Sequence, residues 1–374
     1  MLTPKERMRR AMTNGVPDCV PVMPQICHPH AIRMLGMPFE ETLIEVLLRP
    51  ELMNRLDYEC AKRYGVDGMR LAVTGDPTER KEILQEDGII WRMNPGTGRK
   101  TARLDVEGGG WWVPLEEEVT LHDEADVDRL PLPTSAEIIA SGKLDSARKI
   151  ACEAGPDMFM AAWAPAFTVE YLTTVRGKAQ TFVDLIERPE FCHHALNKAT
   201  DIAIQTAIAM AKVGIDGVML GETFGGVIGP RLYAEFCLPY MRRFVEAVRP
   251  HGLLTYQHTC GNSTALFELM ADSGADCIEP LDPLGGVSVA DAKRRVGARV
   301  GLMGGVHTVL LARGSLREVQ ADCARCLAEG APGGGYILAC GDMLPTETSP
   351  EKVRAMVEAA HLCRYSDEKQ RRHA

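Results

Sequence analysis

The sequence contains no apolar run that approaches the roughly 20 residues needed to cross a bilayer. Residues 1–7 are typical of the capped start of an amphipathic helix and not of a secretory leader. The chain of 374 residues has a formal net charge of −9 and no basic stripe, which argues against a nucleic-acid partner. Its 12 cysteines follow no compact spacing framework, which favours a reducing compartment. We therefore expect a cytoplasmic protein that binds neither membranes nor nucleic acids.

Short apolar runs alternate with helix-length segments along most of the chain. Eight such runs indicate a parallel barrel more than an open doubly wound sheet. We therefore predict an α/β fold in which residues 1–374 form a single (β/α)8 TIM-type barrel. The expected strands lie at residues 20–26, 68–73, 158–163, 217–220, 253–257, 277–281, 300–303 and 335–339.

One stretch interrupts this alternation after the second expected strand. Residues 79–118 contain an apolar run at 89–92, a Gly-Thr-Gly turn and a Gly-Gly-Gly-Trp-Trp segment at 108–112. This pattern predicts a small antiparallel β-hairpin inserted into the barrel. We interpret it as a lid or rim within the one domain.

The most specific chemical pattern is His258-Thr259-Cys260, at the polar end of an apolar run. In an extended strand, residues i and i+2 point to the same face, so one imidazole and one thiolate can meet at one point. Cys340 ends another such run and would complete a set of three ligands. Three protein ligands leave one position of a tetrahedral zinc open for substrate. The competing interpretation is that these are buried structural cysteines.

Active sites of parallel barrels lie at the carboxyl ends of the strands, so other polar and aromatic residues there are also candidates. Gln25 and His28 are expected to contact substrate or to serve only loop structure. Trp163 and Phe224 suit the wall of an apolar pocket. The carboxylates of Glu222 and Asp76 could orient substrate or carry a proton.

Four segments resemble the uroporphyrinogen decarboxylase superfamily. They are the start at residues 3–7 with Pro21-Val22, the segments 230–240 and 301–305, and the closing segment 348–357. The similarity runs nearly end to end and implies a barrel with its cleft at the carboxyl ends of the strands.

Other segments depart from the decarboxylases of that superfamily. Those enzymes carry an arginine-rich segment after the first strand and a late Gly-His-Gly segment. Here residues 24–30 contain no arginine, and Cys340-Gly341-Asp342-Met343 stands at the later position. A tetrapyrrole with eight carboxylates needs cationic groups to hold it. Uroporphyrinogen decarboxylation is therefore the less favoured hypothesis.

The pattern His258-x-Cys260 with a later cysteine is similar to the corrinoid-dependent zinc methyltransferases of the same superfamily. This resemblance implies zinc bound by His258, Cys260 and Cys340, with Asp342 as the alternative third ligand from the family's register. It also implies methyl transfer between a small methylated substrate and a corrinoid protein. No Asp-x-His-x-x-Gly cobalt-ligand motif is present, so the corrinoid is expected on a separate partner.

Three further hypotheses remain open at this stage. The methyl group could pass from the corrinoid to a thiol, the barrel could be a metal-free decarboxylase, or the zinc could be structural. The preferred donor is an aryl methyl ether, with methylamine and methanol as other candidates. The pattern is also compatible with a homodimer.

Overall fold

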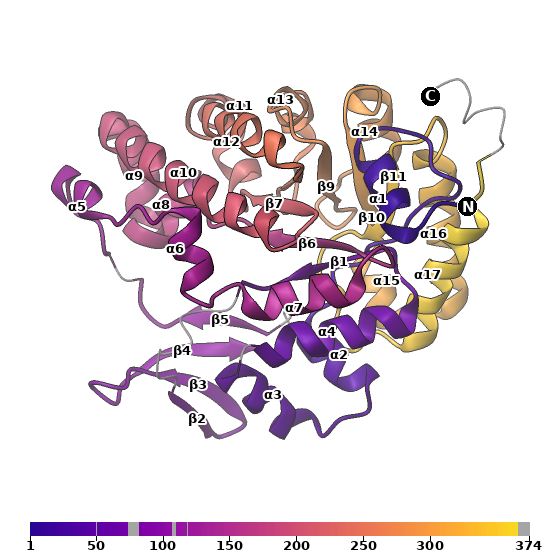
Figure 1. The fold of residues 1–374 in the computed structure, drawn as a ribbon, viewed down its shortest axis with the longest axis horizontal. Helices are drawn as coiled ribbons and strands as arrows, with labels where there is room; N and C mark the ends of the chain where they lie inside the picture. The colour runs from indigo at the N-terminus through magenta and orange to yellow at the C-terminus, as the bar shows by residue number, and fades with distance from the viewer. Residues whose placement is uncertain (50, 74–81, 107–109, 118, 366–374) are drawn as a thin grey trace.

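The computed structural model describes residues 1–49, 51–73, 82–106, 110–117 and 119–365 (Figure 1). Its centre is a curled sheet of seven parallel strands in the order β1-β6-β7-β8-β9-β10-β11. The predicted α/β fold of the TIM-barrel type is therefore confirmed. The strands are β1 (Gly68–Leu71), β6 (Phe159–Trp163), β7 (Gly217–Gly221), β8 (Leu254–His258), β9 (Cys277–Leu281), β10 (Gly301–Val306) and β11 (Tyr336–Cys340).

The first expected strand, at residues 20–26, is not a strand, and this prediction was wrong. Pro21 and Pro24 have no N–H to donate to a ladder, so the segment pairs only at isolated points. Val22 forms a single parallel bridge with Leu338 of β11, and its carbonyl accepts a hydrogen bond of 2.9 Å from the Asp67 N–H, just before β1. The irregular segment therefore lies between the two edge strands of the curled sheet, where an eighth strand would lie.

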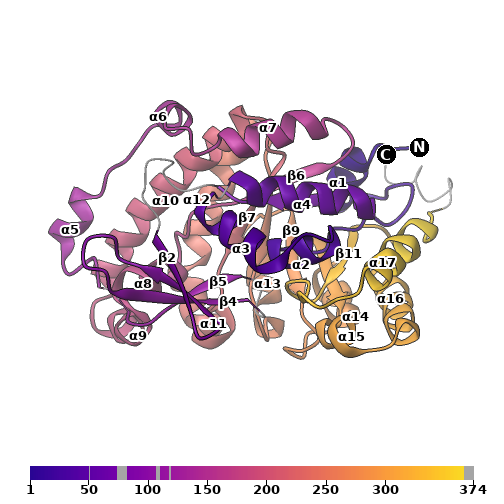
Figure 2. The same cartoon turned by 90° about the horizontal axis from the view of Figure 1, so that it is seen from below.

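Helices cover the outer face of this sheet and separate its strands in sequence. The helices α16 and α17 lie at the end of the molecule opposite α5 and α9 in both views (Figure 1 and Figure 2). Among the described residues, no helix is both long and apolar enough to cross a bilayer. The helices of the first half are α1 (Pro4–Met12), α2 (His28–Met34), α3 (Phe39–Leu48), α4 (Glu51–Tyr64), α5 (Glu124–Arg129), α6 (Ser135–Ala140), α7 (Asp145–Ala154), α8 (Val169–Arg176) and α9 (Lys178–Glu187). Those of the second half are α10 (Pro189–Lys212), α11 (Gly225–Phe236), α12 (Leu238–Val248), η1 (Arg249–His251), η2 (Thr264–Leu266), α13 (Phe267–Asp272), α14 (Val289–Val296), α15 (Thr308–Arg313), α16 (Leu316–Gly330) and α17 (Pro350–Leu362).

The core has two parts because side chains alternate between the two faces of each strand. One set of buried side chains, including Met219, Tyr256 and Ile337, packs inside the curled sheet together with Met8 and Met12 of α1. The other set fills the layer between the sheet and its helices. Since α1 supplies part of the interior set, the amino-terminal helix contributes directly to the barrel core.

The inserted element is larger than the predicted hairpin. It is a four-stranded antiparallel sheet in the order β2-β3-β4-β5, and it lies beside α3 at one edge of the molecule (Figure 1). Its apolar face supplies Ile90 and Leu104 to a small core shared with Ile32 of α2 and Leu43 of α3. The strands are β2 (Glu82–Glu86), β3 (Ile89–Met93), β4 (Lys100–Asp105) and β5 (Trp111–Pro114).

Candidate metal centre

His258 and Cys260 meet at the carboxyl end of β8. The imidazole Nε2 of His258 lies 3.0 Å from Sγ of Cys260. His258 is the last residue of the strand and is paired with Gly221 of β7 and Glu279 of β9. Cys260 lies two residues beyond the end of β8, and its thiol meets the imidazole there.

A chain of hydrogen bonds holds the His258 imidazole in this orientation. Its Nδ1 lies 2.8 Å from Oε2 of Glu279, which is itself fully buried. The Gln25 amide donates to the other Glu279 oxygen, and the Gln25 carbonyl oxygen accepts from Arg70. A carboxylate on the second ring nitrogen is the usual outer partner of a metal-binding histidine, because it fixes the ring and raises its basicity.

The same neighbours also set the pKa of the His258 imidazole. Burial alone would lower the pKa of this imidazole, but the neighbouring Glu279 carboxylate and Cys260 raise it well above its usual value. Burial likewise raises the pKa of Glu279, yet the imidazole and Arg70 bring it below its usual value. Nε2 is thus the ring nitrogen left to face Cys260.

Asp342 is the third member of the group. One ligand atom each from His258, Cys260 and Asp342 lies within 4.8 Å of the other two. The chain reaches this position through Gly341, where a Cβ would lie only 2.5 Å from Cδ of Pro283. Only glycine allows such a close passage, so Gly341 lets the loop after β11 bring Asp342 to the cavity.

Cys340 lies differently from Asp342. It is fully buried in the same core cluster as Leu338, whereas Ile337 and Ala339 belong to the interior cluster. Its Sγ accepts a hydrogen bond of 3.3 Å from the Gln25 N–H, and burial raises the pKa of its thiol to about 12. The geometry therefore favours Asp342 over Cys340 as the partner of His258 and Cys260.

The three residues line a cavity of about 610 Å³. Three of the residues around it are carboxylates: Glu170, Asp282 and Asp342. Burial raises the pKa of Asp282, and the nearby Asp342 raises it further. Among the described residues that line this cavity there is no arginine or lysine. The remaining lining residues are Gln25, Trp111, Trp163, Met219, Gly221, Thr223, Leu284, Thr308, Met343, Leu344 and Pro345.

The other predicted site residues are placed as follows. Gln25 and Trp163 line the cavity of the candidate metal centre, and His28 lines a neighbouring one together with Trp163. Phe224 lies outside the described linings of both cavities and packs edge-on against Phe182 instead. Asp76 lies outside the described residues.

Glu222 is fully buried behind the cavity wall. Its Oε2 accepts from the Glu170 N–H at 3.4 Å and from the Cys237 thiol at 3.3 Å. Burial raises the pKa of this carboxyl to about 7. Glu222 thus contacts the residue that faces the cavity and does not line the cavity itself.

Trp111 and Glu170 are among the cavity residues that sequence reasoning missed. Trp111 belongs to the inserted strand β5, and Glu170 lies in the first turn of α8, so neither ends a barrel strand. The Trp111 indole packs against that of Trp163 at a centroid distance of 5.1 Å. The Gly-Gly-Gly-Trp-Trp run was the available signal, because such a run allows a close approach of the backbone to the barrel.

Fold and site together define a barrel protein with a histidine, a cysteine and a carboxylate converging at the carboxyl ends of its strands. Residues 107–362 match the family model for uroporphyrinogen decarboxylase (URO-D), which is more than half of the chain. The chain therefore belongs to the uroporphyrinogen decarboxylase family.

Individual relatives carry the same family name. The uroporphyrinogen decarboxylase of Yersinia enterocolitica is 29% identical over 250 residues, which cover 63% of this chain and 68% of that protein. The one from Xanthomonas axonopodis pv. citri is 33% identical over 195 residues, covering 49% and 52%. The chain thus spans about half the length of several of these relatives.

Among solved structures, a methyltransferase from Methanosarcina mazei aligns with a TM-score of 0.73. The alignment covers 96% of this chain and 98% of that one at 22% sequence identity. This likeness shows that the two proteins share a fold along almost their whole length.

Proposed function

We propose that this protein is a zinc-dependent methyltransferase that moves a methyl group from a small methyl ether to a reduced corrinoid carried by a separate protein. The observation that supports it best is the convergence of His258, Cys260 and Asp342 on one cavity, with donor atoms within 4.8 Å of one another. The methyltransferase fold of the Methanosarcina mazei protein agrees with this choice but does not decide it.

The donor set fits zinc. Imidazole nitrogen, thiolate sulfur and carboxylate oxygen are its usual protein ligands, and three of them leave a tetrahedral ion one open position. That open position distinguishes a catalytic from a structural site. Zinc bound there would supply a Lewis acid for the ether oxygen, which makes the departing alkoxide or phenoxide more stable.

The chain's own residues orient the reactants. Glu279 keeps the His258 imidazole in place through its bond to Nδ1, and Gln25 keeps Glu279 in place. Trp111 and Trp163 pack against each other and form an aromatic part of the cavity wall. Glu170 faces the cavity, so its carboxylate can receive or deliver the proton that the departing oxygen needs. Glu222 acts as a positioning residue that holds the Glu170 backbone.

The reaction balances without another reactant. The bond between the ether oxygen and its methyl carbon breaks, and a bond between cobalt and that carbon forms. The oxygen keeps the electron pair of the broken bond and later takes a proton, while the reduced cobalt supplies the pair for the new bond.

Decarboxylation of a porphyrinogen is the alternative that the relatives' names suggest. Its substrate carries many carboxylates and needs cations around it. The metal cavity presents three carboxylates, and none of its described lining residues is an arginine or lysine. Like charges would repel such a substrate, so the cavity disfavours a polycarboxylate.

The test is a panel of methyl donors offered to the zinc-loaded protein with reduced cobalamin. Formation of methylated cobalamin is read from its visible spectrum for methyl ethers, methylamines and methanol. We expect transfer from an ether, loss of transfer after chelation and recovery with added zinc. Transfer only from methylcobalamin to a thiol would reverse the direction, and carbon dioxide release from a porphyrinogen would overturn the proposal.

A further inference from the structure

Arg70 is a positively charged residue on the inner face of the barrel sheet. Its neighbours in β1, Met69 and Leu71, belong to the core between the sheet and its helices, so the alternation of the strand points Arg70 inward. The residue is half-buried, and among the described residues no carboxylate forms an ion pair with its guanidinium. Charged groups held away from water are usually paired with an opposite charge. The position of Arg70 therefore calls for another partner.

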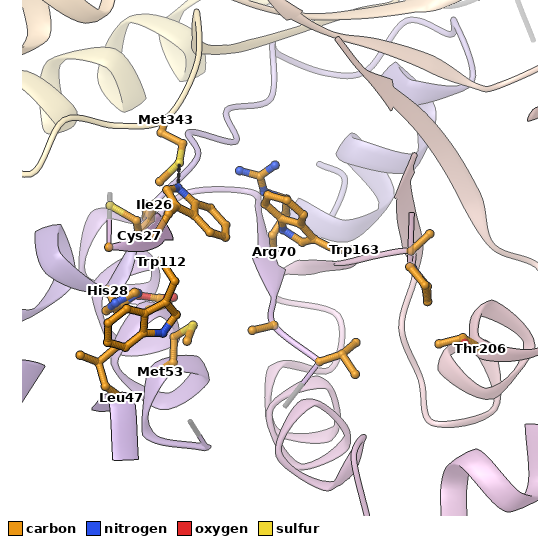
Figure 3. Close-up of a pocket in the computed structure, with 17 residues that line it drawn as sticks. Ile26, Cys27, His28, Leu47, Met53, Arg70, Trp112, Trp163, Thr206 and Met343 are labelled. Atoms are coloured by element: carbon orange, nitrogen blue, oxygen red, sulfur yellow. Dashed lines mark hydrogen bonds between the residues drawn. The ribbon is translucent and has the colours of Figure 1, made fainter. Parts of the chain in front are cut away.

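Aromatic and sulfur-containing side chains hold the guanidinium in place. Its central carbon lies 4.9 Å from the centroid of the Trp163 ring, and Figure 3 shows the guanidinium beside that indole. Its Nη1 donates to Sδ of Met219 at 2.9 Å, and its Nη2 donates to Oε1 of Gln25. A planar, charged donor in a fixed place thus begins the chain of hydrogen bonds that leads to His258.

The backbone of Gln25 is fixed by the segment that carries Asp342. The Gln25 N–H donates to Sγ of Cys340 at 3.3 Å, and the Gln25 carbonyl accepts from the Leu344 N–H at 3.0 Å. Gln25 and Met343 also form an isolated parallel bridge. The freedom that remains lies in the side chain, above all in the choice between the two orientations of its amide.

Arg70 and Glu279 select the same orientation of this amide. A guanidinium only donates, a carboxylate only accepts, and the amide of Gln25 has one accepting and one donating end. As observed, the amide oxygen faces Arg70 and the amide nitrogen faces Glu279. A flipped amide would set like groups against each other at both ends. The two charges also polarise the amide in the same direction, which strengthens both hydrogen bonds.

The orientation of the amide determines which oxygen of Glu279 is left for His258. The Gln25 amide occupies Oε1, and Oε2 lies 2.8 Å from Nδ1 of the imidazole. Nε2 then points to Cys260, next to Asp342. Four side chains from separate parts of the barrel thus form one continuous chain that ends at the candidate metal ligands.

We propose that Arg70 is a positioning residue of the candidate metal centre, which acts on His258 through Gln25 and Glu279. It holds the Gln25 amide in the one orientation that can pin the Glu279 carboxylate, and the carboxylate holds the imidazole ready for the metal. Arg70 itself contacts neither the metal nor the substrate. The inference rests on the proposed function only in that the ion to be bound is zinc.

The first test is a double-mutant cycle on zinc affinity, measured by competition with a chromophoric chelator. Arg70→Met should lower the affinity about tenfold, the lower end of what the loss of an outer partner costs. The same substitution made in Gln25→Leu should change the affinity by less than about twofold, because the connection to Glu279 is already broken. An equal loss in both backgrounds, or no loss in the wild type, would overturn the inference.

Arg92→Met is the matched control. Arg92 lies over the ring of Trp112 in the inserted sheet, 5.9 Å from its centroid, so it also combines an arginine with a tryptophan. The control should keep zinc affinity within about twofold of the wild type. A loss equal to that of Arg70→Met would overturn the inference, because the effect would then follow from removing any such arginine.

A second readout needs neither zinc nor turnover. In the metal-free full-length protein with isotope-labelled histidine nitrogens, NMR follows the Nδ1–H of His258, which is identified by its absence in His258→Gln. We expect this proton to exchange with water at least about tenfold faster in Arg70→Met than in the wild type, since its acceptor Glu279 is held less firmly. Unchanged exchange would overturn the inference.

Gln25→Glu serves as the second variant should Arg70→Met fail to fold. Its carboxylate can still accept from Arg70 but cannot donate to Glu279, so zinc affinity should fall at least about tenfold. Unchanged affinity would overturn the inference. If the exchange depends on Arg70 but the protein binds no zinc or transfers no methyl group, only the proposed function fails. If transfer occurs while neither readout depends on Arg70, only this inference fails.

Discussion

At the scale of single residues, the unresolved choice in the sequence was between Cys340 and Asp342. Residues two apart share a face in a strand, so Cys340 and Asp342 would do so if β11 continued to Asp342. The strand β11 ends at Cys340, however, and the chain then bends through Gly341, so the alternation does not continue to Asp342. Cys340 packs in the core, and Asp342 lies with His258 and Cys260. Spacing alone cannot reveal where a strand ends.

Because Asp342 lies in the ligand group and Cys340 does not, substitution of Asp342 should weaken zinc binding and substitution of Cys340 should not. Asp342→Ala should weaken zinc affinity by more than about 100-fold, because even the loss of an outer partner costs about 10- to 100-fold. Cys340→Ala should leave the affinity within about threefold of the wild type, as expected for a thiol outside the group. Competition with a chromophoric chelator measures both. A larger loss of zinc affinity in Cys340→Ala than in Asp342→Ala would make Cys340 the ligand.

His28 also predicts how stability changes with pH. Its pKa is about 4 in the folded protein against 6.5 as the ordinary value, so the unfolded chain takes up a proton first as the pH falls. The stability that His28 contributes is therefore complete above about pH 6.5 and is lost progressively toward pH 4. From pH 7 to pH 5 the loss is about 2 kcal/mol for this one group.

The measurement is urea denaturation of the wild type and of His28→Leu at the two pH values. We expect the wild type to lose about 2 kcal/mol more than the variant between pH 7 and pH 5. Equal losses in both proteins would show that His28 is protonated in the folded state or is not buried.

At the scale of elements, the positions of the seven regular strands could be predicted from the sequence, but the irregular structure of residues 20–26 could not. Seven of the eight apolar runs form strands of the parallel sheet, because a run buried on both faces must be apolar whatever its partners. The run at residues 20–26 is also apolar, but it contains Pro21 and Pro24. These two residues have no N–H to donate to a neighbouring strand. The inserted sheet was recognised from its turns, but its contact with the site was not, since Trp111 reaches the cavity only through tertiary packing.

The irregular segment is held by Asp67 in place of a full ladder. The Asp67 carboxylate accepts from the Val22 N–H at 2.9 Å, from His361 at 2.8 Å and from Arg7. Its side chain is only 1% exposed, so removing it leaves the Val22 N–H without this partner and breaks the buried ion pair with Arg7. Asp67→Ala should therefore lower the free energy of unfolding by about 3 kcal/mol.

A matched substitution separates this effect from the general loss of an ion pair. Asp201→Ala removes the partner of Arg243 at a site where the side chains are 41% and 39% exposed, and it should cost less than about 1 kcal/mol. Urea denaturation of both variants gives the comparison. A similar cost for the two would mean that Asp67 does not hold the segment.

At the scale of the whole molecule, the family and the site suggest different reactions. Membership of the uroporphyrinogen decarboxylase family follows from a match over residues 107–362, and the curated relatives share that name. The fold supports either reaction, because barrel enzymes vary their chemistry through the loops at the strand ends. The proposal of methyl transfer rests on the cavity, which combines three candidate metal ligands with carboxylates where cations would be needed to hold a porphyrinogen.

The most direct test is the rate of methyl transfer from a methoxyphenol to reduced cobalamin in three proteins, each incubated with zinc: the wild type, Cys260→Ala and Cys152→Ala. Cys152 is an exposed free cysteine of α7 and serves as the matched control. We expect methylated cobalamin to form at similar rates with the wild type and Cys152→Ala, and no transfer with Cys260→Ala. Equal transfer by Cys260→Ala, or release of carbon dioxide from a porphyrinogen by a protein that transfers no methyl group, would contradict a metal-dependent methyltransferase.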